Sequence, residues 1–584
     1  MADDQTTPYC YFLFCSFGAQ RRACRQTFTH IHADRWPLRR TTHSGGIKPS
    51  GRADTYGQIG ESMIQPMTKN MTKKTTRQPP QRDIFDALVS FASRERFDRI
   101  PERVRAMAKL HIIDGIGVML AGASAPTTRA LVRGLAANEH GSGADIVGTG
   151  HTVSAPTAAF ANAFSGRVLD YDDVQTTETS IYGLLAHPTV PVLAAALAIG
   201  QSRNVSGEAL LVAYLAGVEA ATRIADTAEP KSLRAGCAPT ATFAGIGAVI
   251  AATKLLKLKP KAARAALSLW AATTARDRPT TEAPSTTALR EAHSVRAAVE
   301  AALFVAEGLT VAVPDLPLAS DAVKPLALVK NFGNPYMILQ PGFAIRVYSS
   351  HPLTHPALDL ILAIVNLHDM CAGEIKRIEI GITNIMAETL SLKIPTNVSE
   401  LRRNLPFVVA LAACRGILTP DDFDRIPRQK PLLDLMRRIH CRAHPDLDAL
   451  GHERARTIVG VTLKSGRIIE MKMDVAKGTP QKPLSEIELF HKFFQCALPI
   501  LDGRKAERLL NRLWLLDEAP QVAGLCKLDA RWPTDVEPGN AGGHPHAHDH
   551  DDAHGRGHHA HLGHDDPFHG HQRSARPKRA REKK

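Results

Sequence analysis

Residues 162–200 read NAFSGRVLDYDDVQTTETSIYGLLAHPTVPVLAAALAIG, and this stretch joins two contrasting kinds of sequence. Three carboxylates, Asp170, Asp172 and Asp173, lie within four residues, and a single His187-Pro pair follows a polar segment. Beyond that pair the sequence is rich in Ala and Leu. Segments that are apolar all round are typical of buried helices, so the stretch predicts charged groups at the edge of a dense helical core.

The same helical character extends on both sides of this stretch. Residues 83–93 and 101–123 carry apolar side chains at i, i+3 and i+4 spacing, and Ala-rich segments continue over 155–308. Spacing near 3.6 residues is the pattern of a helix with a buried face. Most of the chain before residue 308 is therefore expected to be α-helical.

A different pattern appears further along the chain. Ile378, Ile380 and Ile382 alternate with polar residues, which predicts a half-buried strand. Residues 455–476 alternate in the same way on both sides of a turn at 464–467, which predicts a β-hairpin. Helical spacing returns after the hairpin.

Together these patterns predict a mainly α protein, in which a large helical domain is interrupted by a smaller α/β lid domain. The helical domain is expected at 83–340, the lid at 341–481, and a return to the helical domain at 482–530. The leader at 1–82 lacks sustained periodicity and the tail at 531–584 is of low complexity, so both are expected to be disordered.

The composition is that of an ordinary globular protein. The 584 residues are 44% hydrophobic and 22% charged, which excludes a wholly disordered chain and a membrane protein. The formal net charge of +14 belongs to the ends, because residues 1–80 carry +7 and residues 572–584 carry +6, which leaves about +1 between them. The central region therefore shows no sign of nucleic-acid binding.

The cysteines and the N-terminal residues indicate the compartment. Nine cysteines are scattered without a CxxC pair, which is typical of reduced thiols in the cytoplasm. Asp3 and Asp4 precede a short apolar run, whereas a secretory signal needs a basic start and a longer apolar run. No stretch of about 18 unbroken apolar residues is present. A cytoplasmic protein without membrane contact is expected.

Seven segments, taken in order, resemble the MmgE/PrpD family over roughly residues 83–530. That family includes 2-methylcitrate dehydratase, cis-aconitate decarboxylase and iminodisuccinate epimerase. Order and spacing carry the resemblance, because each Ala-rich segment alone matches many helices. The segments are NAFSGRVLDYDD, HPTVPVLAAALAIG, SGEALLVAYLAGVEAATRIA, GCAPTATFAGIGAVIAATKLL, VYSSHPLTHPALD, GRIIEMKMDVAKGTP and PLSEIELFHKFF.

The resemblance implies acid–base chemistry beside a carboxylate, in a cleft between the helical and lid domains and without a cofactor. The expected activity is that of a lyase, either a dehydratase or a decarboxylase, or of an isomerase, on a small di- or tricarboxylic acid. Asp170 and His187 match the family's active-site Asp and His and are expected to be the catalytic residues. A homodimer is expected as well.

A second group of candidate residues is expected to bind the substrate. Arg346, His351 and His355 lie in RVYSSHPLTHPALD, where two histidines four apart would share one face of a helix. A guanidinium group can hold a carboxylate through two hydrogen bonds, so Arg346 is the expected anchor. The resemblance implies that this segment faces the catalytic pair.

Two further substrate-binding candidates and two departures come from the resemblance. The family has a polar or basic residue before an Ala-rich helix, which would correspond here to Arg290 or His293. Tyr182 lies in a loop that is longer than in the decarboxylases. Val174 stands where members often have Thr, and Ala238 stands where the family's Gly-x-His-x-Thr motif has His. These departures put the substrate in doubt.

Other interpretations of the same residues stay open. The carboxylates Asp170, Asp172 and Asp173 could be a solvated loop and helix cap, or could bind a cation. The chain could also be an inactive or repurposed scaffold of the family, in which the 11 histidines between His544 and His571 handle divalent metal ions. A disordered tail that binds metal ions adventitiously is the simpler interpretation of those histidines.

Overall fold

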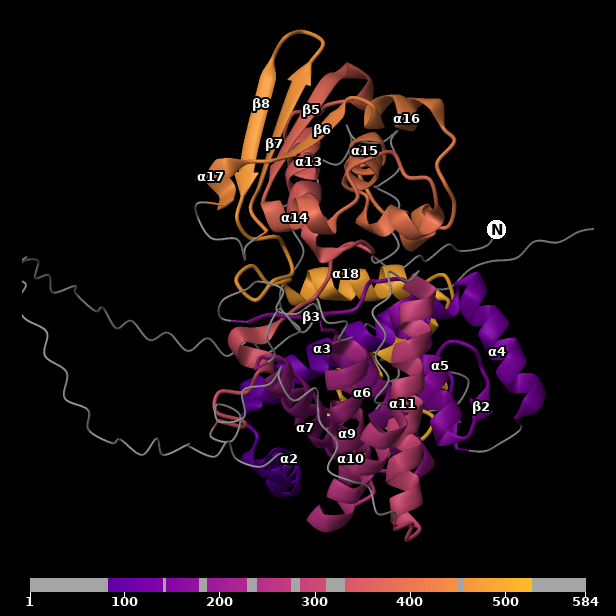
Figure 1. Ribbon diagram of the computed structural model, residues 1–584. Helices are drawn as coiled ribbons and strands as arrows, with labels where there is room; N and C mark the ends of the chain where they lie inside the picture. The colour runs from indigo at the N-terminus through magenta and orange to yellow at the C-terminus, as the bar shows by residue number, and fades with distance from the viewer. Residues whose placement is uncertain are drawn as a thin grey trace, which may run out of the picture. The chain divides into compact units, whose positions relative to one another are not determined.

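The computed structural model describes residues 82–139, 143–177, 186–227, 239–274, 284–310, 331–448 and 455–527. The described residues are mainly helical and contain one four-stranded sheet (Figure 1). They confirm the expected mainly α fold with a smaller α/β part. The leader at 1–81 and the histidine-rich tail lie outside the described residues.

The first hydrophobic core is formed by α2 (Arg82–Arg94), α3 (Glu102–Ala123), α4 (Pro126–Asn138), α5 (Ala155–Val168), α6 (Thr189–Ser202), α7 (Gly207–Ala225), α9 (Gly245–Leu255), α10 (Pro260–Thr274) and α11 (Pro284–Ala306). Small residues allow these helices to cross closely. A Cβ on Gly122 of α3 would lie 1.7 Å from the carbonyl oxygen of Ser165 in α5. A Cβ on Gly217 of α7 would lie 2.6 Å from the carbonyl oxygen of Gly247 in α9. The Ala- and Gly-rich sequence is therefore a requirement of the helix crossings.

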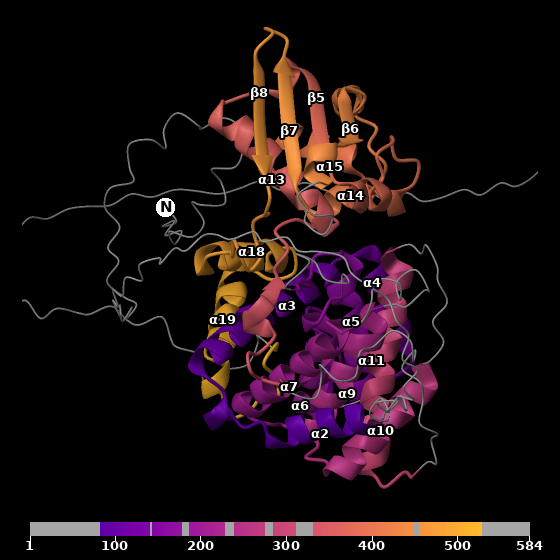
Figure 2. The same ribbon diagram turned by 60° about the vertical axis from the view of Figure 1, so that its left-hand side comes forward.

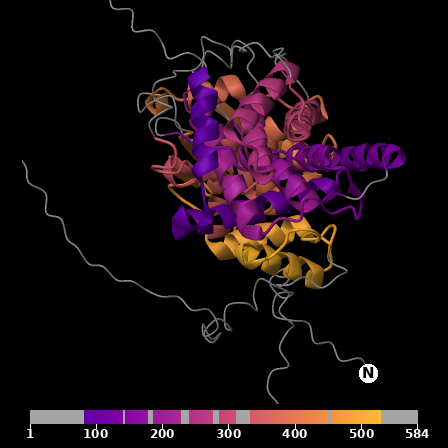
Figure 3. The same cartoon turned by 90° about the horizontal axis from the view of Figure 1, so that it is seen from below.

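Two C-terminal helices, α18 (Glu486–Ala497) and α19 (Gly503–Trp514), pack on this core. Phe493 of α18 lies against Gly117 of α3, and Figure 3 shows the yellow C-terminal helices beside the indigo and purple ones. Among the described helices, α3 is the one that is long and apolar enough to cross a membrane, but 78% of its apolar window is buried inside the protein. We therefore interpret α3 as the central helix of the first core.

A second core is built on a mixed sheet with the strands β5 (Ile375–Ile382), β6 (Ile439–Ala443), β7 (Thr457–Leu463) and β8 (Ile468–Met473). The strand order is β6-β5-β7-β8, which Figure 2 shows, with β5 and β6 parallel and the other pairs antiparallel. The three isoleucines of β5 that alternate in the sequence are fully buried, and β7 and β8 form the predicted hairpin. The helices of this part are α13 (His355–Leu367), α14 (Asn384–Thr389), α15 (Leu405–Arg415), α16 (Lys430–Met436) and α17 (Pro445–Asp448).

Two short strand pairs complete the described fold. In the first, β1 (Ala144–Asp145) pairs with β2 (Thr152–Val153). In the second, β3 (Val174–Gln175) pairs with β4 (Phe343–Ala344), although these residues are far apart in the sequence. This second pair brings the carboxylate-rich stretch beside the chain that leads into the sheet-containing part.

Candidate active site

The candidate catalytic residues and substrate-binding residues meet at the β3–β4 pair. Val174 pairs with Ala344, so the carboxylates just before β3 lie beside Arg346, which follows β4. The segment after β4 continues to His351, whose backbone N–H donates to the carbonyl oxygen of Arg402 (2.8 Å). Residues from both hydrophobic cores therefore contribute to one polar cluster.

The cluster contains two arginines and three carboxylates: Arg167, Arg346, Asp170, Asp172 and Glu291. Arg346 donates from Nε to the backbone oxygen of Asp172 (2.5 Å), from Nη2 to Asp172 Oδ1 (2.6 Å), and from Nη1 to Asp170 Oδ1 (2.5 Å). Arg167 donates to the same Oδ1 of Asp172 through Nη1 and to Glu291 Oε2 through Nε (2.5 Å). Each buried cation is thus matched by carboxylates, which offsets the cost of removing the charges from water.

The pKa values follow from the arrangement of these charges. Burial by itself would raise the pKa of Asp170, but Arg346 and then Arg167 outweigh burial and hold that pKa well below its usual value. The pKa of Asp172 is also lowered, because Arg167 and the other nearby positive charges outweigh burial. Burial prevails at Glu291, whose pKa is raised. Both aspartates are therefore ionised at neutral pH.

Asp170 differs from the other carboxylates in two ways. Its side chain keeps 23% of its surface exposed, whereas that of Asp172 is completely buried. Its φ of 49° lies in the left-handed region, which costs a residue with a Cβ roughly 1–2 kcal/mol. Backbone strain at a solvent-reachable ionised group is a common property of functional sites.

His187 is held in one tautomer. Its Nδ1 lies 2.8 Å from the backbone oxygen of Asp173, and since a carbonyl only accepts, Nδ1 carries the hydrogen. Burial, followed by the charge of Arg167, lowers the pKa of His187 to about 3. The neutral ring therefore carries a lone pair on Nε2. Its backbone N–H donates to Thr240 Oγ1 (3.1 Å), which fixes the residue just before α6.

His351 is held in the opposite tautomer. Its Nδ1 accepts a hydrogen bond from the backbone N–H of Leu353 (3.3 Å), so the hydrogen of the neutral ring is on Nε2. Burial lowers the pKa of His351 to about 4, against the opposing charge of Asp170. Both His187 and His351 contribute to the lowered pKa of Asp170, so both imidazoles lie within electrostatic reach of this carboxylate.

The sequence predicted that His351 and His355 share one face of a helix, and this prediction is wrong. His351 precedes a short 3₁₀ turn (Pro352–Thr354) and acts as its N-cap, whereas His355 begins α13, so the two do not share one face of a helix. His355 Nε2 lies 3.3 Å from the backbone oxygen of Ser350, and its ring contacts the ring of Tyr348 edge-on. Burial lowers the pKa of His355 to about 3, and its contacts are those of a packing residue.

The other candidate residues have different surroundings from those expected. The guanidinium of Arg346 is taken up by Asp170 and Asp172 and is almost completely buried, so it does not face an open site. His293 is exposed on α11 and its ring contacts that of Phe160 in a tilted arrangement, with ring centroids 4.8 Å apart. Helix α11 contributes Glu291 to the cluster instead. Tyr182 lies outside the described residues.

Asp173 caps a helix, as the alternative interpretation of the three aspartates proposed. Its Oδ1 accepts from the backbone N–H of Thr189 (3.2 Å), at the first residue of α6, and its Oδ2 accepts from the hydroxyl of Thr189 (2.5 Å). The same Oδ2 lies 2.9 Å from His111 Nδ1 on α3. Asp173 therefore anchors the start of the helix that follows His187.

A second buried ion pair, between Lys492 and Asp114, contacts the loop that contains Tyr171. Lys492 of α18 lies 2.6 Å from Asp114 Oδ1, donates to the backbone oxygen of Tyr171 (3.1 Å) and lies over the ring of Tyr171. Sequence reasoning missed this pair and His111. One signal was present, because His111 and Asp114 are polar residues one turn apart in the most apolar part of α3.

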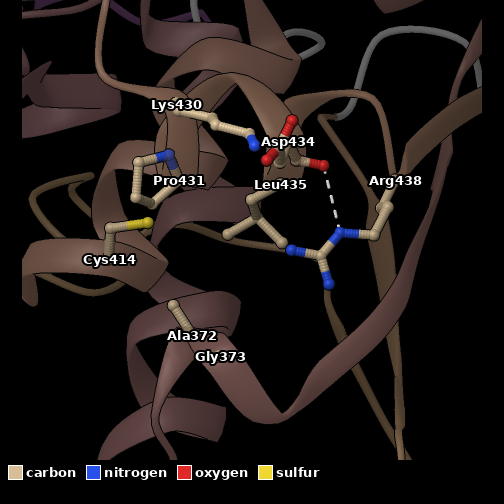
Figure 4. A pocket seen from close by; sticks show the side chains of 8 residues that line it. All are labelled: Ala372, Gly373, Cys414, Lys430, Pro431, Asp434, Leu435 and Arg438. Atoms are coloured by element: carbon tan, nitrogen blue, oxygen red, sulfur yellow. Dashed lines mark hydrogen bonds between the residues drawn. The ribbon is translucent and has the colours of Figure 1, made fainter.

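A cavity of about 290 Å³ in the sheet-containing part shares no residue with the cluster (Figure 4). In its lining, Arg438 donates from Nε to the backbone oxygen of Asp434 (3.0 Å) and from Nη1 to that of Ile375. Burial raises the pKa of Cys414, so its thiol lacks the thiolate character of a nucleophile. We therefore place the candidate active site at the charged cluster.

Comparison with known proteins supports the order of segments found in the sequence. Residues 86–317 match the MmgE/PrpD N-terminal domain and residues 348–517 match the MmgE/PrpD C-terminal domain. Cis-aconitate decarboxylase of Homo sapiens is 26% identical over 386 residues, which cover 64% of this chain and 78% of that protein. The Mus musculus enzyme of the same name is 24% identical over 387 residues, with the same shares of 64% and 78%. That of Aspergillus terreus is 25% identical over 200 residues, 34% of this chain and 41% of the relative.

Proposed function

The chain belongs to the MmgE/PrpD family, and on that basis we propose that it is a lyase or isomerase that moves a proton beside a carboxylate of a small di- or tricarboxylic acid. The similarity to cis-aconitate decarboxylases supports a substrate of this class. The proposed step needs an acid, a base and charge stabilisation, and no cofactor is part of it. The cytoplasmic homodimer expected from the sequence belongs to the same proposal.

The observation that carries the proposal is the pair of neutral imidazoles with opposite tautomers beside Asp170. His187 presents a lone pair on Nε2, and His351 presents a hydrogen on Nε2. One ring is ready to accept a proton and the other to donate one, without any prior change of protonation. Proton transfer beside a carboxylate requires this combination.

The two rings account for either reaction type. In a dehydration, His187 Nε2 takes the proton from the carbon beside the carboxylate, the C–O bond breaks, and the leaving oxygen takes the Nε2 proton of His351 to leave as water. In a decarboxylation, the C–C bond breaks to release CO₂, and the electron pair left on carbon takes the proton from His351. An isomerase would return the proton to the opposite face of the same carbon.

Asp170 and Asp172 support the base in this scheme. Asp172 Oδ2 lies 3.4 Å from His187 Nδ1, and both carboxylates raise the pKa of His187 against burial. Their charge therefore stabilises the imidazolium that forms when His187 takes a proton. The Asp170 carboxylate is bound to Arg346 Nη1, whereas His187 Nε2 has no partner among the described residues, so we assign proton removal to His187.

The test is a substrate screen of the full-length protein with di- and tricarboxylic acids, following alkene absorbance and CO₂ release. For any acid that is turned over, His187→Gln and Asp170→Asn are expected to lower kcat/KM by about 100-fold or more, the usual scale for losing acid–base help. His293→Gln is the matched control, since this histidine is exposed and contacts the ring of Phe160, and it should leave kcat/KM unchanged. Normal turnover in His187→Gln would remove the assignment of the base, and no turnover of any acid by the wild type would remove the reaction class.

A further inference from the structure

Arg402 is a buried cation beside the candidate site, on the 3₁₀ turn Val398–Arg403. Only 7% of the surface of Arg402 is exposed to solvent. Its Nη1 donates to the backbone oxygen of Ser349 (2.8 Å) and to Ser349 Oγ, and its Nη2 lies 3.5 Å from the backbone oxygen of Pro420. The guanidinium carbon lies 4.6 Å from the centre of the Phe423 ring. None of these partners is a carboxylate.

This arrangement differs from that of the other buried arginines in the cluster. Arg167 binds Asp172 and Glu291, and Arg346 binds Asp170 and Asp172. Arg402 forms no ion pair with any carboxylate in the part of the chain that the structure describes. Burial lowers the pKa of Arg402 to about 10, so the group is charged at neutral pH and its charge is poorly compensated.

Two hydrogen-bonded contacts place Arg402 beside the candidate active site. The hydroxyl of Ser349, which binds the guanidinium, donates to the backbone oxygen of Leu169 (2.7 Å), the residue before Asp170. The backbone oxygen of Arg402 accepts from His351 N–H (2.8 Å). Asp170 is also the strongest of the charges that act on the pKa of Arg402.

We propose that Arg402 binds a carboxylate of the substrate, in place of Arg346. The proposal rests on the proposed function, since it names the group that holds the acid while His187 and His351 act on it. Nη1 is occupied by Ser349, whereas Nε donates to no group among the described residues. A planar fork with a free Nε edge can bind a carboxylate through two parallel hydrogen bonds, which a lysine cannot do. The substrate therefore has one carboxylate that binds Arg402 and a separate carbon on which His187 and His351 act.

A purely structural role makes the opposite prediction for stability. If Arg402 served only to hold Ser349 and Phe423, its loss would lower the melting temperature and leave ligand affinity alone. If its charge is kept for a ligand, an apolar side chain of similar length removes a poorly compensated buried charge, which is neutral or stabilising in the free protein. Arg402→Met therefore separates the two roles.

The experiment is calorimetric titration of the full-length protein with tricarballylate, a stable tricarboxylate, together with melting curves of the ligand-free variants. Arg402→Met is expected to weaken tricarballylate binding by about tenfold to hundredfold, the scale of removing a buried charged partner, without lowering the melting temperature. Arg402→Lys keeps the charge but loses the fork, and should also bind at least about tenfold more weakly. Arg437→Met is the matched control, because Arg437 is an exposed arginine of the same core that pairs with Asp434.

The outcomes are distinguishable. Unchanged affinity in Arg402→Met, or a lower melting temperature with unchanged affinity in Arg402→Lys, would overturn the role of Arg402 and leave the proposed function standing. If the wild type bound neither tricarballylate nor succinate, the proposed function would fail and Arg402 would fail with it. Weaker binding in both variants with Arg437→Met unaffected supports the inference.

Discussion

Replacing Arg346 by methionine should destabilise the protein strongly at neutral pH. The guanidinium donates three hydrogen bonds of 2.5–2.6 Å to Asp170 and Asp172, and its removal leaves Asp172 completely buried with Arg167 as its remaining guanidinium partner. Hydrogen bonds to charged groups are worth about 1.5–3 kcal/mol each before the burial cost of the arginine is subtracted. Breaking a buried ion pair from one side costs about 3–5 kcal/mol, and we expect the variant to lose that amount.

Melting curves measure this loss directly. With an unfolding entropy of about 2.1 cal/mol/K per residue and about 400 folded residues, a loss of about 3–5 kcal/mol lowers Tm by about 4–6 °C. Arg96→Met is the control, because Arg96 and its partner Asp98 are 67% and 69% exposed. An exposed pair contributes at most about 1 kcal/mol, so Tm should barely change in that variant.

The pH dependence gives the refutation. In the wild type the pKa of Asp172 lies below its usual value, so its stabilisation is complete above the usual pKa and is lost as the pH falls through the lowered one. Without Arg346 one of the charges that lower the pKa of Asp172 is missing, so this pKa is higher in the variant than in the wild type, although Arg167 remains. The stability difference that comes from Asp172 is complete at neutral pH and is lost as the pH falls through the raised pKa, so the difference in Tm between wild type and variant should shrink from pH 7 towards pH 3. If the difference in Tm between wild type and Arg346→Met did not change with pH, or if it stayed within about 1 °C at neutral pH, the assigned charge cluster would be refuted.

Two further predictions concern the remaining groups. Because the pKa of His187 is about 3 and that of His351 about 4, kcat/KM should be flat between pH 6 and 8 and should fall only in more acidic solution; a group titrating with a pKa near 6.5 in the pH–rate profile would contradict the assigned protonation states. Lys492→Met leaves Asp114 buried with a pKa already raised by burial, so Tm should fall by a similar amount to that of Arg346→Met. In Lys492→Met/Asp114→Leu most of the loss should be recovered, and a double variant no more stable than Lys492→Met would show that the pair is not isolated.

Local periodicity was sufficient to predict the fold. The strand Ile375–Ile382 and the hairpin after it could be read from alternation, and α3 could be read from helical spacing, because each element buries one face of its own residues. The stretch 162–200 also indicated correctly that charge lies at the edge of the helical core. These features depend on neighbours in the sequence.

The partners of each charged residue could not be read in this way. Arg346 was predicted as an anchor for a substrate carboxylate, but Asp170 and Asp172 bind its guanidinium. They reach it through the pairing of Val174 with Ala344, which is a long-range contact. Arg402 and Arg403 are adjacent and equally charged in the sequence, but only Arg402 is buried. Which side of a short 3₁₀ turn faces the interior is decided by packing against Phe423, and no local pattern predicts it.

The pairing of β3 with β4 has a consequence for the synthesis of the protein. The groups of the site are spread from Asp170 to Arg402, and the lysine that supports its loop is Lys492, near the end of the described residues. On the ribosome, helices α3 to α11 can dock as they emerge, whereas the charged cluster has to wait until Arg346 is available to Asp172. Closing so long a loop makes this the slow part of folding. A nascent chain stalled before residue 346 would leave Asp170 without its guanidinium partner and the face of α3 around Gly117 without Phe493 of α18, so that an apolar surface which the complete chain covers would stay exposed.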